Sequence, residues 1–197
     1  MAAHSDLEPE VVRRARAGDA GAFEAVVRHF QHRVHALAYR LTYDGELARD
    51  ITQEVFIHLY ERFDRYDPAR PFTPWFLRLA TNYTLNARAK ARLRRAQSLD
   101  TGGPDEGSPR RDPGDADAAP VSAQVATSEE RARVRAAVRE LPEKYAGVVV
   151  LHYLEGLGVK EIAERLDMPV GTVKIRLFRA RDQLRQALRG LEEPPSA

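Results

Sequence analysis

Residues 159–174, VKEIAERLDMPVGTVK, set the architecture of the second half of the chain. Residues 160–166 predict a short helix, residues 167–171 a tight turn, and residues 172–188 a long helix with a basic face. This order is typical of a helix-turn-helix motif. The apolar positions that fill the angle between its two helices are Ile162, Ala163, Leu166, Met168, Val173 and Leu177.

The second helix of such a motif presents its N-terminal side chains to base edges, while basic groups farther along meet phosphates. The residues placed to do so are Thr172, Lys174, Ile175, Arg176 and Arg179. These positions therefore predict a contact with duplex DNA. An ordinary amphipathic helical hairpin with a solvated basic face is the alternative interpretation.

Helical signals continue on the N-terminal side of this motif. Residues 127–130, Thr-Ser-Glu-Glu, have the spacing of a capping box and open a helix that ends before Leu141-Pro142. A further helix covers residues 143–154. Ahead of both, residues 97–127 are rich in Gly, Pro, Asp, Ala and Ser, and we expect them to form a flexible linker.

The first half of the chain is also helical. Asp19 is the expected N-cap of a long helix, and the core stripe of this helix consists of Phe23, Val26, Val27, Phe30, Val34, Leu37 and Leu41. A second helix follows Asp44-Gly45 and turns Leu47, Ile51, Val55 and Leu59 inward. It leaves Asp50, Gln53 and Glu54 together on another face. From the pattern alone, that face is a solvated surface.

A third helix is expected to have Thr73 as its N-cap and Pro74 at its first position, and to end near Arg95. Its aromatic side chains, Phe72, Trp75, Phe76 and Tyr83, allow two interpretations. Aromatic residues at helical spacing are usually core. However, strand separation also needs rings on which an extruded base can stack, close to positive charge.

Composition excludes several classes of protein. No apolar run approaches the roughly 20 residues that span a bilayer, and the first residues, MAAHSDLEPE, lack a secretion-signal pattern, so we expect a cytoplasmic protein without membrane insertion. The absence of cysteine excludes disulfides and thiolate zinc sites. His29, His32 and His35 lack a second ligand set, and no nucleophile or phosphate-loop motif is present, so neither a metal, a cofactor nor an enzyme is expected.

Charge is unevenly distributed along the chain. The formal net charge of +2 combines +4 over residues 1–95, −4 over residues 96–127 and +2 over residues 128–197. The positive charge concentrates at two predicted helix ends, between Arg88 and Arg95 and between Lys174 and Arg189. Two basic helix ends indicate two contacts with a polyanion.

Two sets of motifs resemble the extracytoplasmic-function sigma factors of bacterial RNA polymerase. Residues 159–166 (VKEIAERL), residues 169–174 (PVGTVK) and the basic residues up to Arg181 resemble the domain of this family that binds the upstream promoter element. Gly18-Asp19, residues 50–56 (DITQEVF), residues 71–76 (PFTPWF) and Asn82 resemble its core-binding and promoter-melting domain. The two sets occur in the family's order and cover nearly the whole chain except the predicted linker.

The resemblance implies an all-α chain of two small domains. Residues 1–96 would be the region 2 domain, residues 97–127 a flexible acidic linker, and residues 128–197 the region 4 helix-turn-helix domain. The chain would then be an alternative sigma factor that directs promoter-specific initiation without catalysis of its own. The implied partners are promoter DNA, the clamp coiled coil and the flap of the polymerase core, and an anti-sigma factor.

The resemblance also assigns residues to each contact. Core polymerase would contact Asp50, Gln53, Glu54 and Phe56; the minus-ten element Trp75, Arg78, Asn82, Asn86 and Arg88; and the minus-thirty-five element Thr172, Lys174, Ile175, Arg176 and Arg179. Arg49, Thr81 and Ile175 depart from residues common in the family. For Ile175, which stands where serine is common, we expect contact with a thymine methyl group.

Two other functions compete with this interpretation. A conventional helix-turn-helix regulator would bind duplex DNA without polymerase. A helical adaptor would use its basic patches to bind an acidic protein, and it would show no promoter preference and little sensitivity to salt.

Overall fold

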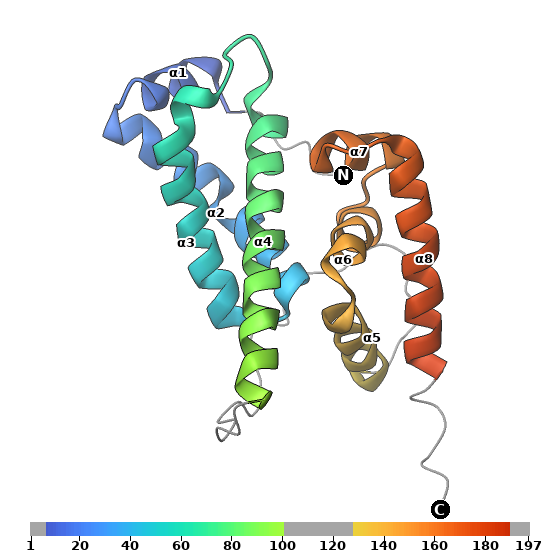
Figure 1. Cartoon of the computed structure of the whole chain (residues 1–197). Coiled ribbons are helices and arrows are strands. Elements are labelled where there is room, and N and C mark those ends of the chain that lie inside the picture. The colour runs from blue at the N-terminus through green and yellow to red at the C-terminus, as the bar shows by residue number, and fades with distance from the viewer. Residues whose placement is uncertain (1–6, 101–127, 190–197) are drawn as a thin grey trace, which may run out of the picture. The chain divides into compact units, whose positions relative to one another are not determined.

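The computed structural model describes residues 7–100 and 128–189, and all the regular elements in these ranges are helices (Figure 1). They are, in order, α1 (Pro9–Arg16), α2 (Ala20–Thr42), α3 (Gly45–Arg62), the 3-10 turn η1 (Phe63–Arg65), α4 (Phe72–Asp100), α5 (Ser128–Glu140), α6 (Glu143–Val149), the π-helical turn η2 (Val150–Leu154), α7 (Val159–Leu166) and α8 (Val170–Arg189). The predicted all-α class is confirmed.

Contacts divide the chain into two compact units. Among the described residues, the first unit contains those up to Thr84 together with Ala163–Met168, and the second contains those between Leu85 and Ile162 and those from Pro169 to Arg189. Helix α4 therefore contributes its first half to one unit and its second half to the other. The domain boundaries drawn from the sequence remain predictions.

The end of α4 corrects one expectation. The sequence placed the helix end near Arg95 and the start of the linker at residue 97, but α4 continues to Asp100. The alanine- and arginine-rich sequence before this point favours helix, and no Gly or Pro stops it until residue 102. The rest of the predicted linker, residues 101–127, lies outside the described residues.

Carboxylate caps fix the starts of α2 and α3. As predicted, Asp19 accepts a hydrogen bond from the Ala22 N–H at 3.0 Å. Asp44 accepts one from the Leu47 N–H, also at 3.0 Å. Each bond satisfies one of the N–H groups that a helix start leaves without an intrahelical partner. Between the two helices, Tyr43 adopts a left-handed φ of 48°.

The core of the first unit lies where α2, α3 and α4 meet. The predicted stripe of α2 is buried at Val26, Phe30, Val34, Leu37 and Leu41, while Phe23 and Val27 are half-buried. From α3, Ile51, Val55 and Leu59 are buried, and Leu47 is half-buried.

Aromatic rings attach α4 to this core. The ring centroids of Phe72 and Phe76 are 5.6 Å apart, and that of Phe30 lies 5.0 Å from that of Phe76. The prediction for the start of α4 was wrong by two residues, because the helix begins at Phe72 and includes Thr73 and Pro74 in its first turn. Burial of Phe72 favours this earlier start, and the missing N–H of proline costs nothing in a first turn.

In the second unit, α8 lies alongside α5 and α6 (Figure 1). Helix α5 ends at Glu140, before Leu141-Pro142, as predicted. The single helix expected over residues 143–154 is instead α6 followed by η2, in which the Glu155 N–H reaches back five residues to the Val150 carbonyl at 3.0 Å.

The predicted helix-turn-helix is present as α7, a turn, and α8. Of its predicted apolar positions, Ile162, Ala163, Val173 and Leu177 are buried, and Leu166 and Met168 are half-buried. In the turn, Asp167 adopts a left-handed φ of 53°, which asparagine and aspartate tolerate better than most residues. No helix in the described ranges is long and apolar enough to cross a membrane.

The cap of α3 gives a testable prediction. Asp44→Ala removes the acceptor of the Leu47 N–H, and we expect the free energy of unfolding to fall by about 1 kcal/mol. Asp44→Asn keeps a side-chain oxygen at the same place and should remain close to wild type. Urea unfolding followed by circular dichroism measures both, and equal losses for the two variants would contradict the capping role.

Candidate functional site

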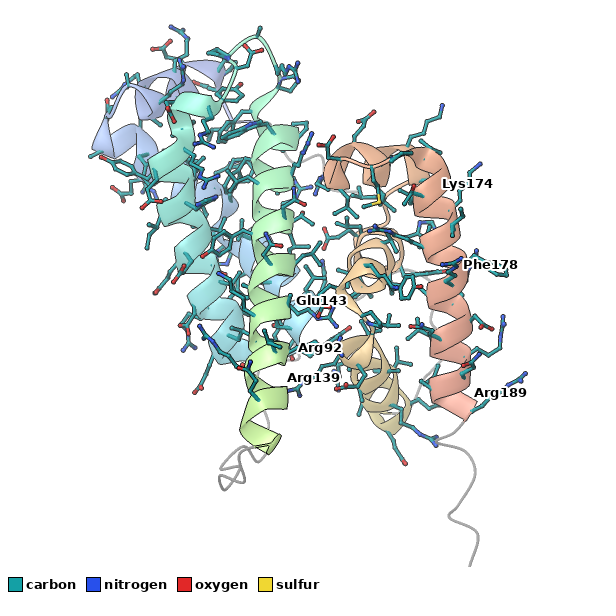
Figure 2. The ribbon with its side chains drawn as sticks, in the orientation of Figure 1. Arg92, Arg139, Glu143, Lys174, Phe178 and Arg189 are labelled. Atoms are coloured by element: carbon teal, nitrogen blue, oxygen red, sulfur yellow. The ribbon has the colours of Figure 1, made fainter. Side chains whose placement is uncertain are left out.

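Helix α8 has one buried face and one exposed face. Val173, Leu177 and Ala180 are buried in the second unit. Lys174, Ile175 and Arg179 are exposed, and 55% of the Ile175 surface is accessible. Thr172 is half-buried. Lys174 and Phe178 project from α8 away from α6 (Figure 2). Three of the five residues predicted to contact duplex DNA are therefore exposed on this helix, and Thr172 and Arg176 are half-buried.

Phe178 was missed by the sequence analysis. Its ring is 69% exposed, the highest value among the large hydrophobic side chains described as exposed. The signal was available, because Phe178 lies three residues after Ile175 and four after Lys174, on the same face of the helix. An exposed ring beside basic groups adds an apolar contact to this surface.

Arg176 differs from the other predicted contacts of α8. It is half-buried, and its Nη1 lies 3.5 Å from the Lys144 carbonyl of α6. It follows Val173 by three residues and precedes Leu177 by one, which directs it towards the packed side of the helix. Arg176 therefore borders the exposed surface and does not lie at its centre.

Helix α3 exposes the predicted acidic and amide face. Asp50, Gln53 and Glu54 are all exposed. Phe56 corrects the prediction, because it is 8% exposed and its ring centroid lies 5.7 Å from that of Phe76. Phe56 lies three residues before the buried Leu59, on the same side of the helix, so its ring is unavailable to a partner.

Two large apolar side chains extend the α3 face. Ile57 is 58% exposed and Tyr60 is 64% exposed. The sequence analysis missed both, although Ile57 follows Glu54 by three residues and lies off the core stripe. Carboxylates beside accessible apolar groups are typical of the rim and centre of a protein interface.

Tyr83 of α4 supports the α3 face. Its hydroxyl donates a hydrogen bond to Glu54 Oε2, and its ring centroid lies 5.2 Å from that of His58. This hydrogen bond to the carboxylate, followed by partial burial, raises the pKa of Tyr83 to about 12. The neutral hydroxyl is thus favoured, and it holds the Glu54 carboxylate in a fixed position.

The other predicted side chains of α4 lie along one stripe. Trp75, Arg78, Asn82 and Asn86 are separated by three or four residues, which places them on one side of the helix. Asn86 is exposed and the other three are half-buried. Arg78 is ion-paired with Asp167 at the end of α7, where both side chains remain partly exposed.

The aromatic residues of α4 are mainly packed. Phe72 and Phe76 are buried, which excludes base stacking on them. The Trp75 ring lies 5.1 Å from that of Tyr66 and 5.9 Å from that of Phe72, as expected for a mainly packed side chain. Thr81, one of the departures from the family, is fully buried and donates to the Leu77 carbonyl at 2.7 Å. It is therefore not part of the exposed stripe.

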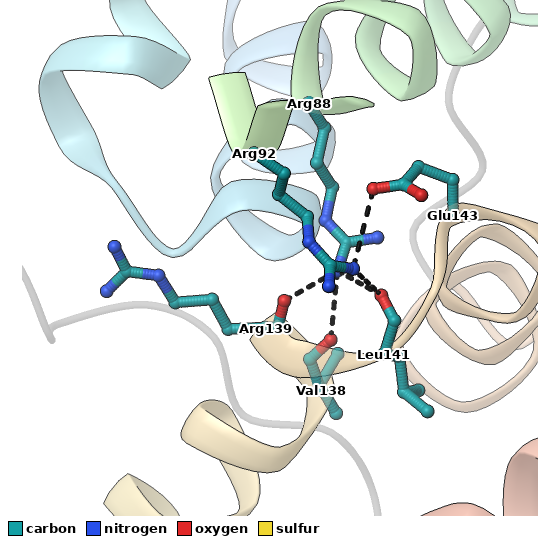
Figure 3. Close-up of polar contacts among 6 residues, drawn as sticks. All are labelled: Arg88, Arg92, Val138, Arg139, Leu141 and Glu143. Atoms are coloured by element: carbon teal, nitrogen blue, oxygen red, sulfur yellow. Dashed lines mark hydrogen bonds and ion pairs between the residues drawn. The ribbon is translucent and has the colours of Figure 1, made fainter. Parts of the chain in front are cut away.

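Arg88, which was predicted to contact the minus-ten element, is buried. It lies off the stripe, is only 3% exposed, and donates to backbone carbonyls at the end of α5 (Figure 3). Burial lowers the pKa of its guanidinium, and the carboxylate of Glu143 partly opposes this shift. The sequence could not show this, because the acceptors lie about 50 residues away in the chain.

No group of three or more potential metal ligands is found in the described part of the chain. His29, His32 and His35 are all exposed on α2. The accessible chemistry of the chain thus lies in the faces of α3, α4 and α8.

Comparisons with known proteins match both halves of the chain. The family model of Sigma-70 region 2 matches residues 26–94, and that of Sigma-70 region 4 matches residues 131–184. The first covers the faces of α3 and α4 described above, and the second covers the helix-turn-helix.

Similar proteins cover almost the full length. The ECF RNA polymerase sigma factor SigW of Bacillus subtilis is 34% identical over 91% of this chain and 96% of its own. The ECF RNA polymerase sigma-E factor of Escherichia coli K12 is 32% identical over 88% of this chain and 90% of its own.

Two solved structures share the fold. CnrH, in complex with the cytosolic domain of CnrY, matches with a TM-score of 0.60 and 23% identity over 93% of this chain and 97% of its own. The sigma factor RpoE of Bartonella quintana, in complex with the anti-sigma factor NepR, matches with a TM-score of 0.57 and 18% identity over 85% and 96%.

The Tyr83–Glu54 bond gives a prediction on pH. Because the pKa of Tyr83 is raised, the bond stabilises the fold below the ordinary value of 10.0 and is lost as the pH rises through about 12. The difference in tyrosinate absorbance between wild type and Tyr83→Phe should therefore stay flat through pH 10. In a Glu54→Gln background, the midpoint of the Tyr83 titration should return towards pH 10.0. A rise in this absorbance difference near pH 10 in the wild type would show that the Tyr83–Glu54 hydrogen bond is absent.

Proposed function

The chain belongs to the extracytoplasmic-function RNA polymerase sigma factors, and from that premise we propose which of its surfaces makes each contact of initiation. It is an alternative sigma factor that binds RNA polymerase core and promoter DNA and directs transcription initiation. The proposal concerns the residues that make each contact and the parts of the core enzyme that they meet. It assigns no catalytic step to the chain, which redirects the chemistry of the polymerase.

One observation carries the proposal. The faces of α3, α4 and α8 that carry most of the sequence-predicted contacts are accessible, while the opposite faces of the same helices are buried in the core. Burial fixes the rotation of each helix about its axis, so the accessible side chains are presented in a defined direction. A contact surface requires side chains that are held in one direction by the packing of their helix.

We assign the face of α3 to the polymerase core. Asp50 and Gln53 supply polar contacts, Glu54 is held by Tyr83, and the exposed Ile57 and Tyr60 supply apolar area. The clamp coiled coil of the largest subunit is the proposed partner of this face. The flap is the proposed polymerase partner of residues 128–197.

We assign the stripe of α4 to the single strand of the minus-ten element. Asn82 and Asn86 carry amides that can both donate to and accept from base edges. Arg78, which is ion-paired with Asp167 but partly exposed, supplies a cation for the backbone of the strand, and the half-buried Trp75 supplies an apolar wall. Because Phe72 and Phe76 are buried, the stripe, and not the rings, carries this contact.

The outer face of α8 is assigned to the minus-thirty-five duplex. Lys174 and Arg179 meet phosphates, and Ile175 and Phe178 provide apolar contact in the major groove, where thymine presents a methyl group. The site of action is the cytoplasm, where the polymerase works. An anti-sigma factor, a partner class seen with the Bartonella quintana protein, would regulate the chain by covering these faces.

Run-off transcription tests the assignment to α8. Core polymerase with this chain, given a library of randomised upstream DNA, should start transcripts behind two spaced elements. Ile175→Ser should keep the minus-ten element and reduce the preference for thymine at one minus-thirty-five position by about fivefold, because the methyl contact is lost. An unchanged preference would remove Ile175 from the base contacts. Tight duplex binding without new transcript starts would favour a conventional regulator.

Holoenzyme assembly tests the assignment to α3. Asp50→Ala removes an exposed carboxylate, and we expect the dissociation constant for core polymerase to rise about tenfold, with circular dichroism unchanged. Glu24→Ala is the matched control, since it removes an exposed carboxylate from α2 outside the proposed surface. Equal affinities of Asp50→Ala and Glu24→Ala for core would overturn the assignment.

A further inference from the structure

One carbonyl joins α1 to the turn that follows α3. The Phe63 carbonyl in η1 accepts from Nε of Arg16, the last residue of α1, at 3.3 Å, and from the Tyr66 N–H at 3.2 Å. Nη2 of Arg16 also donates to the Asp64 carbonyl at 3.2 Å. In Figure 1, α1 and the segment between α3 and α4 lie at the same end of the first unit. Arg16 thus attaches the end of α1 to the start of that segment.

Tyr66 closes residues 66–71, the connecting loop, into one shape. Its hydroxyl donates to the Arg70 carbonyl at 2.5 Å. Within the loop, the Arg70 N–H donates to the Asp67 carbonyl at 3.0 Å, and the Ala69 N–H donates to the Asp67 carboxylate at 3.0 Å. The residues after Tyr66 in this loop are all exposed. Hydrogen bonds, and not burial, therefore determine the shape of the loop beyond Tyr66.

The ring of Tyr66 packs against Trp75. The two ring centroids are 5.1 Å apart, and the ring of Phe72 lies 5.3 Å from that of Tyr66 and 5.9 Å from that of Trp75. Tyr66 is buried, whereas Trp75 is half-buried and belongs to the stripe of α4. The position of the Trp75 indole is therefore limited from one side by Tyr66, and Tyr66 is itself held by its hydroxyl and its N–H.

The hydroxyl of Tyr66 keeps the proton that it donates. Burial raises its pKa, the Asp67 carboxylate acts in the same direction, and the Arg16 guanidinium partly opposes the shift. The hydroxyl is thus neutral at physiological pH, and its hydrogen bond to the Arg70 carbonyl persists under the conditions in which the chain acts.

We infer that Tyr66 and Arg16 are positioning residues for the minus-ten contact, because together they hold Trp75 and the connecting loop in one arrangement beside the stripe of α4. The inference rests on the proposed function of α4 as the helix that holds the minus-ten strand. Both residues act through Trp75 and the loop. The inference also gives α1 a part in promoter binding, although α1 precedes residue 26, where the match to Sigma-70 region 2 begins.

The expected effect is on the affinity for the strand. A surface that is already held in the bound arrangement loses less conformational entropy when its ligand binds. Without the Tyr66 hydroxyl, the loop and the indole of Trp75 gain freedom that binding of the strand must then remove. Affinity for core polymerase should be unaffected, because the face assigned to the core consists of other residues of α3.

The fluorescence of Trp75, the only tryptophan in the chain, tests the first step. Tyr66→Phe removes the hydroxyl and keeps the ring, and Arg16→Gln removes the guanidinium. Acrylamide should quench Trp75 more strongly in both variants than in the wild type. Tyr39→Phe and Arg13→Gln, the same changes at a half-buried ring of α2 and at an exposed position of α1, are the controls. Wild-type quenching in both Tyr66→Phe and Arg16→Gln would overturn the inference.

Strand binding by the holoenzyme tests the second step. The probe is a fluorescein-labelled single strand that carries the minus-ten sequence found by run-off transcription. Tyr66→Phe and Arg16→Gln should each raise its dissociation constant about fivefold, as expected for the loss of one hydrogen bond. The dissociation constant for core polymerase and the circular dichroism spectrum should stay at wild-type values. An equal loss of affinity for core would indicate a general structural role and refute the inference.

Asn82→Ala separates this inference from the proposed function. If Asn82→Ala weakens strand binding while Tyr66→Phe and Arg16→Gln leave it unchanged, the positioning role is refuted and the assignment of α4 stands. If none of the three variants weakens strand binding, the assignment of α4 to the minus-ten strand fails, and the inference fails with it.

Discussion

The packing of Phe76 against Phe30, Phe56 and Phe72 is the constraint on which the first unit depends. With centroid distances of 5.0 to 5.7 Å, these rings join α2, α3 and α4 in one contact. Once Phe56 and Phe76 are inside, neither α3 nor α4 can rotate about its axis without exposing a large apolar ring. The outward direction of Asp50 and Asn82 is thus a consequence of where the aromatic residues are buried.

The same principle operates in the second unit with aliphatic residues. Val173 and Leu177 bury one side of α8, and the opposite side is left to Ile175, Phe178 and basic groups. Ile175 and Phe178 lie three residues apart on one side of the helix, so they form a small apolar patch on this face. Their presence on the exposed face is understandable if that face is covered by a major groove during function.

The two halves of α4 illustrate how one helix can serve two contacts. Its first half is held by aromatic packing, while its second half is held by the buried Arg88 and the half-buried Arg92, which donate to carbonyls at the end of α5. The acidic net charge of residues 96–127 adds repulsion from DNA and leaves the basic helix faces to make the contacts.

The sequence by itself determined the helical class, the helix-turn-helix, the cap at Asp19 and most accessible positions, because helical periodicity and capping act over a few residues. Tertiary structure alone decided the burial of Phe56, the turning of Arg176 towards α6 and the capture of Arg88 by α5. Each depends on partners distant in the chain, which no local pattern encodes. From the sequence, an arginine is expected to lie at the surface. Only the folded chain brings carbonyls that lack intrahelical donors within reach of its guanidinium.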